Sequence, residues 1–155
     1  MSELEKKMEE GAFVKKQLYL AYADSEKSRI ASYQAKWQRK YNLSCINKRE
    51  YGIPEPLPDV HDEEAMDEWA LSNIARHIQL IQQADLVFID FSGQVTTTLM
   101  AELFYSDGYQ KPVHAFIPDP DMAKDAWIRV FPEKLYHHME HFEGFLAGWA
   151  GAVNE

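Results

Sequence analysis

Short apolar runs alternate along the chain with longer segments in which apolar residues recur at helical spacing. Five of the runs predict strands, at 17–22, 43–47, 85–90, 112–117 and 134–138. The run at 85–90 (DLVFID) is almost entirely apolar, which is typical of a strand that is buried on both faces. We therefore place this strand at the centre of the predicted sheet.

The segments between the runs predict helices. The clearest helix spans 62–84, where acidic residues fill the first turns and complement the helix dipole. An apolar stripe follows at helical spacing, made of Trp69, Ile74, Ile78 and Ile81. An earlier helix is expected to begin at Asp24 or Ser25, since either side chain can act as an N-cap. Its buried face is expected to hold Ile30, Tyr33, Ala35 and Trp37.

Three more helices complete the pattern. One of Thr96, Thr97 and Thr98 is expected to cap a helix that runs to about Tyr109. The apolar face of that helix is expected to hold Leu99, Met100, Leu103 and Phe104. Further helices are expected at about 122–130 and at 139–150.

Strands that alternate with helices in this way indicate an α/β fold, with helices on both faces of a parallel sheet. We predict a flavodoxin-like or Rossmann-like three-layer sandwich with a mainly parallel five-stranded sheet in the order 2-1-3-4-5. Residues 1–16 are expected to be a tail or a frayed helix, and residues 17–155 a single domain.

Ligands of such folds bind beyond the carboxyl ends of the strands. Those ends comprise residues 22–25, the loop at 48–60, residues 91–98 and residues 117–121. The 48–60 loop carries three prolines and one glycine, and irregular loops of this length are often functional. Within 91–98, the candidate substrate-binding residues are Ser92, Gly93, Thr96 and Thr98.

The composition narrows the class of protein. The chain has 155 residues, 46% hydrophobic and 13% aromatic, so it can form a core without a disulfide or a metal. Its net charge of −9 argues against binding nucleic-acid polymers or anionic membranes. The N-terminus MSELEKKMEE lacks the apolar segment of a signal peptide, and the sequence has no apolar run long enough for a membrane span. We therefore expect a cytoplasmic protein.

Motifs for metals and cofactors are weak or absent. The single cysteine, Cys45, excludes an intramolecular disulfide and a cysteine-based zinc site, and its apolar strand indicates packing rather than reactivity. His137 and His141 have the spacing of a metal-binding pair, but no third ligand accompanies them, which favours a solvated helix start. No GxGxxG, P-loop or GxSxG motif is present. We expect neither a metal nor a cofactor.

Glu102 is the first candidate for chemistry. It lies at the edge of the apolar face of the predicted 97–109 helix, in the second turn, near the positive end of the helix dipole. A carboxylate there stays ionised while partly desolvated, which suits a nucleophile. The alternative is an ordinary boundary glutamate. Because of its edge position, we expect Glu102→Ala to lower stability by no more than about 1 kcal/mol.

Asn73 and His77 are the second candidates. They are four residues apart and flank the apolar stripe of the 62–84 helix, so both are expected to face inward near the carboxyl ends of the strands. A histidine transfers protons near pH 7. The alternative is a hydrogen-bonded boundary histidine.

Three segments carry a resemblance to a known family: QLYLAY followed by a helix, then NIARHIQLIQQADLVFIDFS, then TTTLMAELFYSDGYQKPV. Their most specific features are QQAD before an apolar strand and the spacing from Glu-Leu to Lys-Pro-Val. Together they resemble the nucleoside 2-deoxyribosyltransferase family, including the related deoxynucleoside 5′-monophosphate N-glycosidases.

The resemblance implies a role for each matching position. Glu102 falls on the family's catalytic glutamate, and Tyr19 falls on the tyrosine that hydrogen-bonds it. His77 stands where the family usually has Asp, and Thr96 where bacterial transferases have an acidic residue and phosphate-binding relatives have Ser. The family loop that contacts the base and the sugar corresponds to Tyr22, Ala23 and Asp24.

The implied activity is cleavage of the N-glycosidic bond of a (deoxy)nucleoside through Glu102, with transfer of the sugar to another nucleobase and with His77 near the base or the sugar. The implied partners are a nucleoside or nucleotide and a free nucleobase. A homo-oligomer is also implied, in which C-terminal residues such as Asn154 and Glu155 reach a neighbouring site.

Three alternatives stay open. The first is a nucleoside 5′-monophosphate N-glycosidase, a hydrolase in which Thr96 to Thr98 and the helix N-terminus hold the phosphate. The second is a nucleotide-binding or sensing module that lacks turnover, which the residues at positions 77 and 96 motivate. The third is a TIR-like domain, because the segment LYLAYADSEK resembles the strand-loop-helix opening of such domains.

Overall fold

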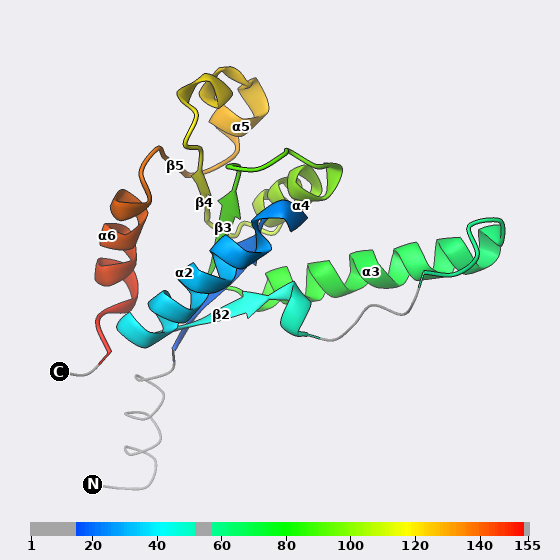
Figure 1. The fold of residues 1–155 in the computed structure, drawn as a ribbon, viewed down its shortest axis with the longest axis horizontal. Coiled ribbons are helices and arrows are strands. Elements are labelled where there is room, and N and C mark those ends of the chain that lie inside the picture. Colours follow the sequence, from blue (N-terminus) through cyan, green and yellow to red (C-terminus); the bar gives the residue numbers. More distant parts are fainter. Residues whose placement is uncertain (1–14, 52–56, 154–155) are drawn as a thin grey trace, which may run out of the picture.

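The computed structural model describes residues 15–51 and 57–153 (Figure 1). Within these ranges, five strands form one sheet in the order β2-β1-β3-β4-β5, and every neighbouring pair is parallel. The strands are β1 (Lys16–Ala21), β2 (Leu43–Asn47), β3 (Leu86–Asp90), β4 (Val113–Phe116) and β5 (Lys134–Tyr136). The predicted strand order is confirmed, and so is the central position of the strand predicted at 85–90.

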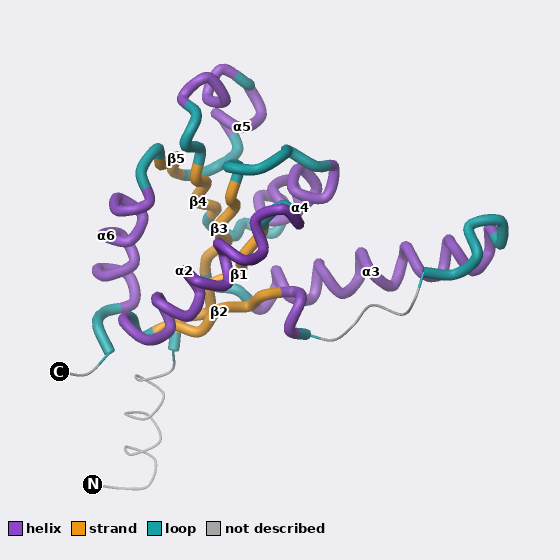
Figure 2. Tube along the Cα trace, in the orientation of Figure 1, coloured by secondary structure: helices purple, strands orange, loops and turns teal. Residues whose placement is uncertain are grey.

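Helices cover both faces of the sheet. One face packs against α2 (Lys27–Lys40) and α6 (Met139–Ala150), and the other against α3 (Glu63–Gln83), α4 (Thr97–Gly108) and the short α5 (Ala126–Val130). Figure 2 shows the strands, in orange, between these helices. The predicted three-layer α/β sandwich of flavodoxin-like order is therefore confirmed.

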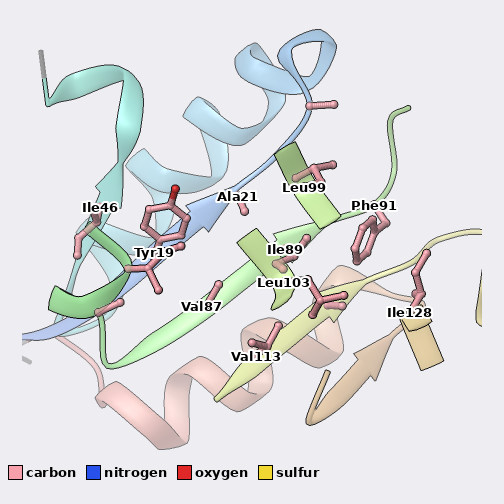
Figure 3. Close-up of a cluster of buried hydrophobic side chains, with 14 of the residues drawn as sticks. Tyr19, Ala21, Ile46, Val87, Ile89, Phe91, Leu99, Leu103, Val113 and Ile128 are labelled. Carbon is pink, nitrogen blue, oxygen red and sulfur yellow. The ribbon is translucent and has the colours of Figure 1, made fainter. Parts of the chain in front are cut away.

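Two apolar cores result, because successive side chains of a strand point to opposite faces of the sheet. Tyr19 and Val87 point toward α3 and α4 and belong to the core drawn in Figure 3. Leu18 and Phe88 belong to the opposite core, under α2 and α6. There the ring of Trp37 meets that of Phe88 edge-on at 5.5 Å between centroids. The first of the two cores carries the candidate site.

The start of α2 differs from the prediction. Asp24 and Ser25 lie in a 3₁₀ turn, η1 (Asp24–Glu26), and α2 begins at Lys27. Glu26 occupies the N-cap position, and its side chain makes no capping hydrogen bond. Neither predicted cap is therefore correct, since a full turn separates the strand from the helix.

One predicted core position of α2 is also wrong. Gln34 is buried where Ala35 was expected, and Ala35 is exposed. The Gln34 carboxamide accepts from Asn47 Nδ2 at 2.9 Å and donates to Glu50 Oε1 at 2.9 Å. These hydrogen bonds satisfy the buried polar side chain, so a glutamine can replace an apolar residue against β2.

The buried face of α4 is rotated relative to the prediction. Thr96 is the N-cap, and its Oγ1 accepts from the backbone N–H of Leu99 at 3.1 Å. Phe104 is 39% exposed, and its ring packs edge-on against Trp127 at 5.8 Å between centroids. Ser106 is fully buried instead, and its hydroxyl donates to the carbonyl of Glu102 at 2.6 Å. This rotation brings Glu102 into the interior.

α3 extends beyond the edge of the sheet, with only its C-terminal end packed on the body of the fold (Figure 1). Leu80 and Ile81 are buried, whereas Ile74 is 47% exposed. Asp62 is the N-cap, because its Oδ1 accepts from the N–H of Ala65 at 3.1 Å. The predicted apolar stripe is thus a core stripe only at Ile81; its remaining members line the cavity described below.

The remaining boundaries refine the prediction. The helix expected at 122–130 is divided into η3 (Pro120–Lys124) and α5, because Asp125 caps the N–H groups of Trp127 and Ile128. The loop expected at 48–60 opens with a 3₁₀ turn, η2 (Lys48–Glu50). No helix within 15–51 and 57–153 is long and apolar enough to cross a membrane.

Several predictions fall on residues that the structure does not describe. The tail or frayed helix expected at 1–16 lies outside the described residues except for its last two positions, and β1 already begins at Lys16. Asn154 and Glu155 also lie outside the described residues.

Candidate active site

Glu102 and Tyr19 form the centre of the site. Tyr19 lies on β1 and is fully buried, and Glu102 on α4 is only 2% exposed. The Tyr19 hydroxyl donates to Glu102 Oε2 at 2.6 Å, the short distance of a charge-assisted hydrogen bond. Burial raises the pKa of Tyr19 well above its usual range, and the charge of Glu102 raises it further. Tyr19 therefore remains a phenol and holds the carboxylate in one orientation.

Lys48 supplies the second donor to Glu102. Its Nζ lies 3.2 Å from Oε1, and its side chain is only 16% exposed. Within the part of the chain that the structure describes, each carboxylate oxygen of Glu102 thus has one side-chain donor, a phenol on Oε2 and an ammonium on Oε1. The ammonium provides the countercharge that a carboxylate needs when it is taken out of water. Glu102 is accordingly a buried ion-paired residue rather than the ordinary boundary glutamate of the alternative interpretation.

His77 approaches the same carboxylate from α3. It is partly buried, and the charge of Glu102 acts on it. Burial lowers the pKa of His77; Glu102 opposes this shift, whereas the charges of Lys48 and Arg76 add to it. The imidazole is therefore mostly neutral at pH 7 and has one ring N–H to donate.

A cavity of about 420 Å³ separates α3 from α4 and has Glu102 in its wall. Its size falls in the range of small-molecule sites. Four of the predicted site residues line it: Asn73, His77, Thr98 and Glu102. The rest of the lining is mostly apolar and consists of Trp69, Ala70, Ile74, Ile78, Ile81, Thr97, Ala101 and Tyr105. A mostly apolar lining with a few polar groups is typical of a small-molecule site.

The predicted residues after β1 lie outside this lining. The hydroxyl of Tyr22 donates to Asn47 Oδ1 at 2.7 Å, and the carboxylate of Asp24 pairs with Arg49. Ala23 is buried. These contacts tie the loop after β1 to the end of β2, so the loop is held next to the turn that carries Lys48.

Ser92 and Gly93 form a second contact between loops. The hydroxyl of Ser92 lies 2.7 and 2.8 Å from the two carboxylate oxygens of Asp90, and Arg29 pairs with both residues. A Cβ on Gly93 would lie 2.9 Å from Cγ of Glu26. Glycine thus allows the loop after β3 to approach the η1 turn closely. Thr96 is likewise used as the helix cap and is absent from the cavity lining.

The remaining titratable candidates have packing partners. Cys45 is buried, and burial raises the pKa of its thiol to about 12, which leaves it unreactive. His137 Nδ1 lies 2.9 Å from the carbonyl oxygen of Ile117, and the rings of His138 and His141 meet at 5.4 Å. Among the described residues, no group of three or more His, Cys, Asp or Glu side chains is arranged to hold a metal ion.

Lys48 is the site residue that sequence reasoning missed. The sequence makes the 48–60 loop a candidate because the loop follows a strand, but it singles out no residue within the loop. A signal was available, since Lys48 is the first residue after β2 and the carboxyl ends of parallel strands share one edge of the sheet.

Two solved structures share the fold of this chain. One is the 2-deoxyribosyltransferase of Bacillus psychrosaccharolyticus, with a TM-score of 0.53 and 16% identity over 82% of this chain and 90% of that one. The other is the CMP N-glycosidase BcmB of Clostridium botulinum, with a TM-score of 0.54 and 13% identity over 86% of this chain and 99% of that one. No protein-family model and no curated protein matches the sequence. At these identities the comparison establishes a common fold.

Proposed function

We propose that this chain cleaves the N-glycosidic bond of (deoxy)nucleosides or their monophosphates, as a member of the nucleoside 2-deoxyribosyltransferase and N-glycosidase family. One observation carries the proposal: the buried Glu102 carboxylate, held by Tyr19 at 2.6 Å, lies in the wall of a mostly apolar cavity. A 2-deoxyribosyltransferase and a CMP N-glycosidase with the same fold support the assignment.

The reaction proceeds in two displacements. In the first, an oxygen of Glu102 forms a bond to the anomeric carbon while the carbon–nitrogen bond breaks, and the bonding pair stays on the nitrogen of the leaving base, which takes up a proton. The nearby carboxylate stabilises the positive charge that develops on the sugar. In the second, a nitrogen of an acceptor nucleobase attacks the anomeric carbon, loses its proton and releases Glu102. Two inversions retain the configuration.

The surrounding side chains support this chemistry. Tyr19 orients the Glu102 carboxylate. Because Tyr19 stays a neutral phenol, it does not itself act as a nucleophile. His77 lies in the cavity wall with Glu102. Its protonated form is assigned to give the leaving base its proton, and the neutral imidazole then takes up the proton that the acceptor base loses. Asn73 and Thr98 line the same cavity and are assigned to hydrogen-bond the ligand. The loops with Tyr22, Ala23, Asp24, Ser92 and Gly93 are assigned to border the sugar.

The second candidate function is hydrolysis of a nucleoside 5′-monophosphate, with water as the acceptor. The specific observation that favours it is the start of α4, where Thr97 and Thr98 line the cavity within the first turn. The N-terminus of a helix attracts a phosphate through its dipole and its unpaired N–H groups. Lys48 adds a cation on the same side of the fold.

We also propose that the protein is a homo-oligomer. α3 and α4 leave apolar side chains exposed, with Ile74 at 47% and Tyr105 at 43% in the cavity wall and Leu71 at 67% elsewhere on α3. A second copy that covered these side chains would close the open side of the site. Light scattering after size exclusion tests the proposal, and a monomer at micromolar concentration would refute it.

A substrate screen tests the enzymatic proposal. Nucleosides and 5′-monophosphates are incubated with and without a free acceptor base, and the products are separated by chromatography. We expect base exchange or base release in the wild type, and its loss in Glu102→Gln. If the wild type binds a nucleotide but cleaves none of the panel, the sensing module replaces the enzyme.

A further inference from the structure

We propose that Lys48 selects a phosphorylated substrate: its ammonium pairs with Glu102 before substrate binds and transfers to the 5′-phosphate when a nucleoside monophosphate enters the cavity. This inference rests on the proposed function and names its substrate class.

The position of Lys48 is the first argument. It begins η2, directly after β2, at the carboxyl edge of the sheet. Its Nζ lies 3.2 Å from Glu102 Oε1, the oxygen that Tyr19 does not hold. Among the described residues, Glu102 is the only carboxylate within 4.0 Å of this ammonium. Lys48 is absent from the cavity lining and borders the site through Glu102, whose second oxygen it holds.

The chemistry of the reaction is the second argument. An oxygen of Glu102 that accepts a hydrogen bond from an ammonium is a weaker nucleophile than an oxygen without that donor. Tyr19 is fully buried within the sheet, whereas Lys48 has a flexible stem that can move its charge. An ammonium next to Glu102 would also repel the positive charge that develops on the sugar. Opening the pair therefore makes Glu102 a stronger nucleophile and removes this repulsion.

The fate of the displaced ammonium is the third argument. A largely buried ammonium needs another anion when its pair opens. Its neighbourhood includes the ring of Tyr22, whose centroid lies 6.0 Å from Nζ, and Arg49 beside the same ring, itself paired with Asp24. A neutral nucleoside brings no anion to this place, whereas a 5′-monophosphate does. The phosphate would thus free the nucleophile as it binds, so that recognition and activation are coupled.

Kinetics with matched substrates test the proposal. For a deoxynucleoside and its 5′-monophosphate, kcat/KM is measured in the wild type, Lys48→Met, Lys48→Arg and the control Lys36→Met. Lys36 pairs with Glu143 at 2.8 Å on the opposite face of the sheet. We expect the wild type to prefer the monophosphate, and Lys48→Met to reduce that preference by about 100-fold, as the loss of a charge-assisted contact predicts. Lys48→Arg should keep most of the preference, and Lys36→Met all of it.

Three results would overturn the assignment. They are equal kcat/KM values for both substrates in the wild type, an equal loss for both substrates in Lys48→Met, and a loss that follows the identity of the base rather than the phosphate. Thermal unfolding shows whether Lys48→Met folds; if it does not, Lys48→Gln replaces it.

Calorimetry separates this inference from the proposed function. The same two ligands are titrated into the wild type and Lys48→Met. If no N-glycosidic bond is cleaved but the monophosphate binds more tightly in a manner that depends on Lys48, the enzymatic proposal fails and the assignment of Lys48 stands. If the enzyme is active but both ligands bind equally well to both proteins, the assignment of Lys48 fails alone.

Discussion

Removal of the Glu102 carboxylate should affect both folding and chemistry. In Glu102→Ala, the phenol of Tyr19 would be left in the core without an acceptor, and Lys48 would lose its anion. The sequence predicted a loss of no more than about 1 kcal/mol, on the premise that the residue stands at the edge of a helix face. The structure places it inside, at 2% exposure, so the expected loss is larger.

The contacts of Glu102 determine how much stability the substitution removes. A buried donor without a partner costs about 1–3 kcal/mol, and breaking a buried ion pair costs about 3–5 kcal/mol. The lower end of the second range applies here, because the Lys48 side chain keeps 16% exposure. We expect Glu102→Ala to lower the free energy of unfolding by about 3 kcal/mol, and Glu102→Gln, which keeps an acceptor for Tyr19, by about 1 kcal/mol. Both variants should lose at least about 1,000-fold in turnover, equivalent to about 4 kcal/mol in the barrier.

Urea denaturation followed by circular dichroism measures the first quantity, and chromatographic assay the second. The matched control is Glu143→Gln, since Glu143 is also a largely buried carboxylate, held by Lys36 and by the indole N–H of Trp37. It should lose stability without loss of turnover. A 2-fluoro sugar nucleoside should leave an adduct on the Glu102 peptide of the wild type. A loss below 1 kcal/mol in Glu102→Ala, near-normal turnover in Glu102→Gln, or an adduct elsewhere would refute the reasoning.

Three further predictions concern other parts of the site. Because the pKa of His77 is lowered in the folded protein, the unfolded chain binds that proton more tightly, and stability falls as the pH drops below about 6.5; His77→Gln should flatten this fall in urea denaturation, and an unaltered profile would contradict the shift. Thr96→Asp keeps an N-cap on α4 but adds a negative charge, so in calorimetry the variant should bind a monophosphate more weakly than it binds the nucleoside. If the substitution weakens the binding of both ligands equally, the phosphate lies elsewhere. Gly93→Ala brings a Cβ to 2.9 Å from Cγ of Glu26 and should cost about 1–2 kcal/mol in thermal unfolding, while an unchanged melting temperature would mean that the Glu26 side chain yields freely.

Much of the architecture could be predicted from local patterns. The apolar run at 85–90 placed β3 at the centre of the sheet, because a strand covered on both faces has no polar side. The cap of α4 could be narrowed to Thr96, Thr97 or Thr98, because an N-cap bonds within its own first turn. The predictions were wrong where the burial of a side chain depends on a partner that is distant in the sequence. Gln34 replaced Ala35 in the interior only because Asn47 and Glu50 satisfy its amide.

The site divides in the same way. Glu102, His77 and Asn73 could be selected from their positions on amphipathic helices, and the family resemblance added Tyr19. The structure brings Glu102 and Tyr19 to 2.6 Å across 83 residues of sequence. It also separates Thr96 from the cavity, because the threonine hydroxyl is used in the cap.

The sequence alone determined the order of the elements and the parallel sheet, because hydrophobic period and chain connectivity are local properties. Only the tertiary structure decided that Glu102 is buried rather than at a boundary, and that Lys48 is its ion-pair partner from 54 residues away. It also decided that the apolar stripe of α3 lines a cavity where a core was expected. These features depend on how α4 is rotated and how far α3 extends past the sheet. Such rigid-body relations are set by the packing of whole elements, and no pattern within a single element encodes them.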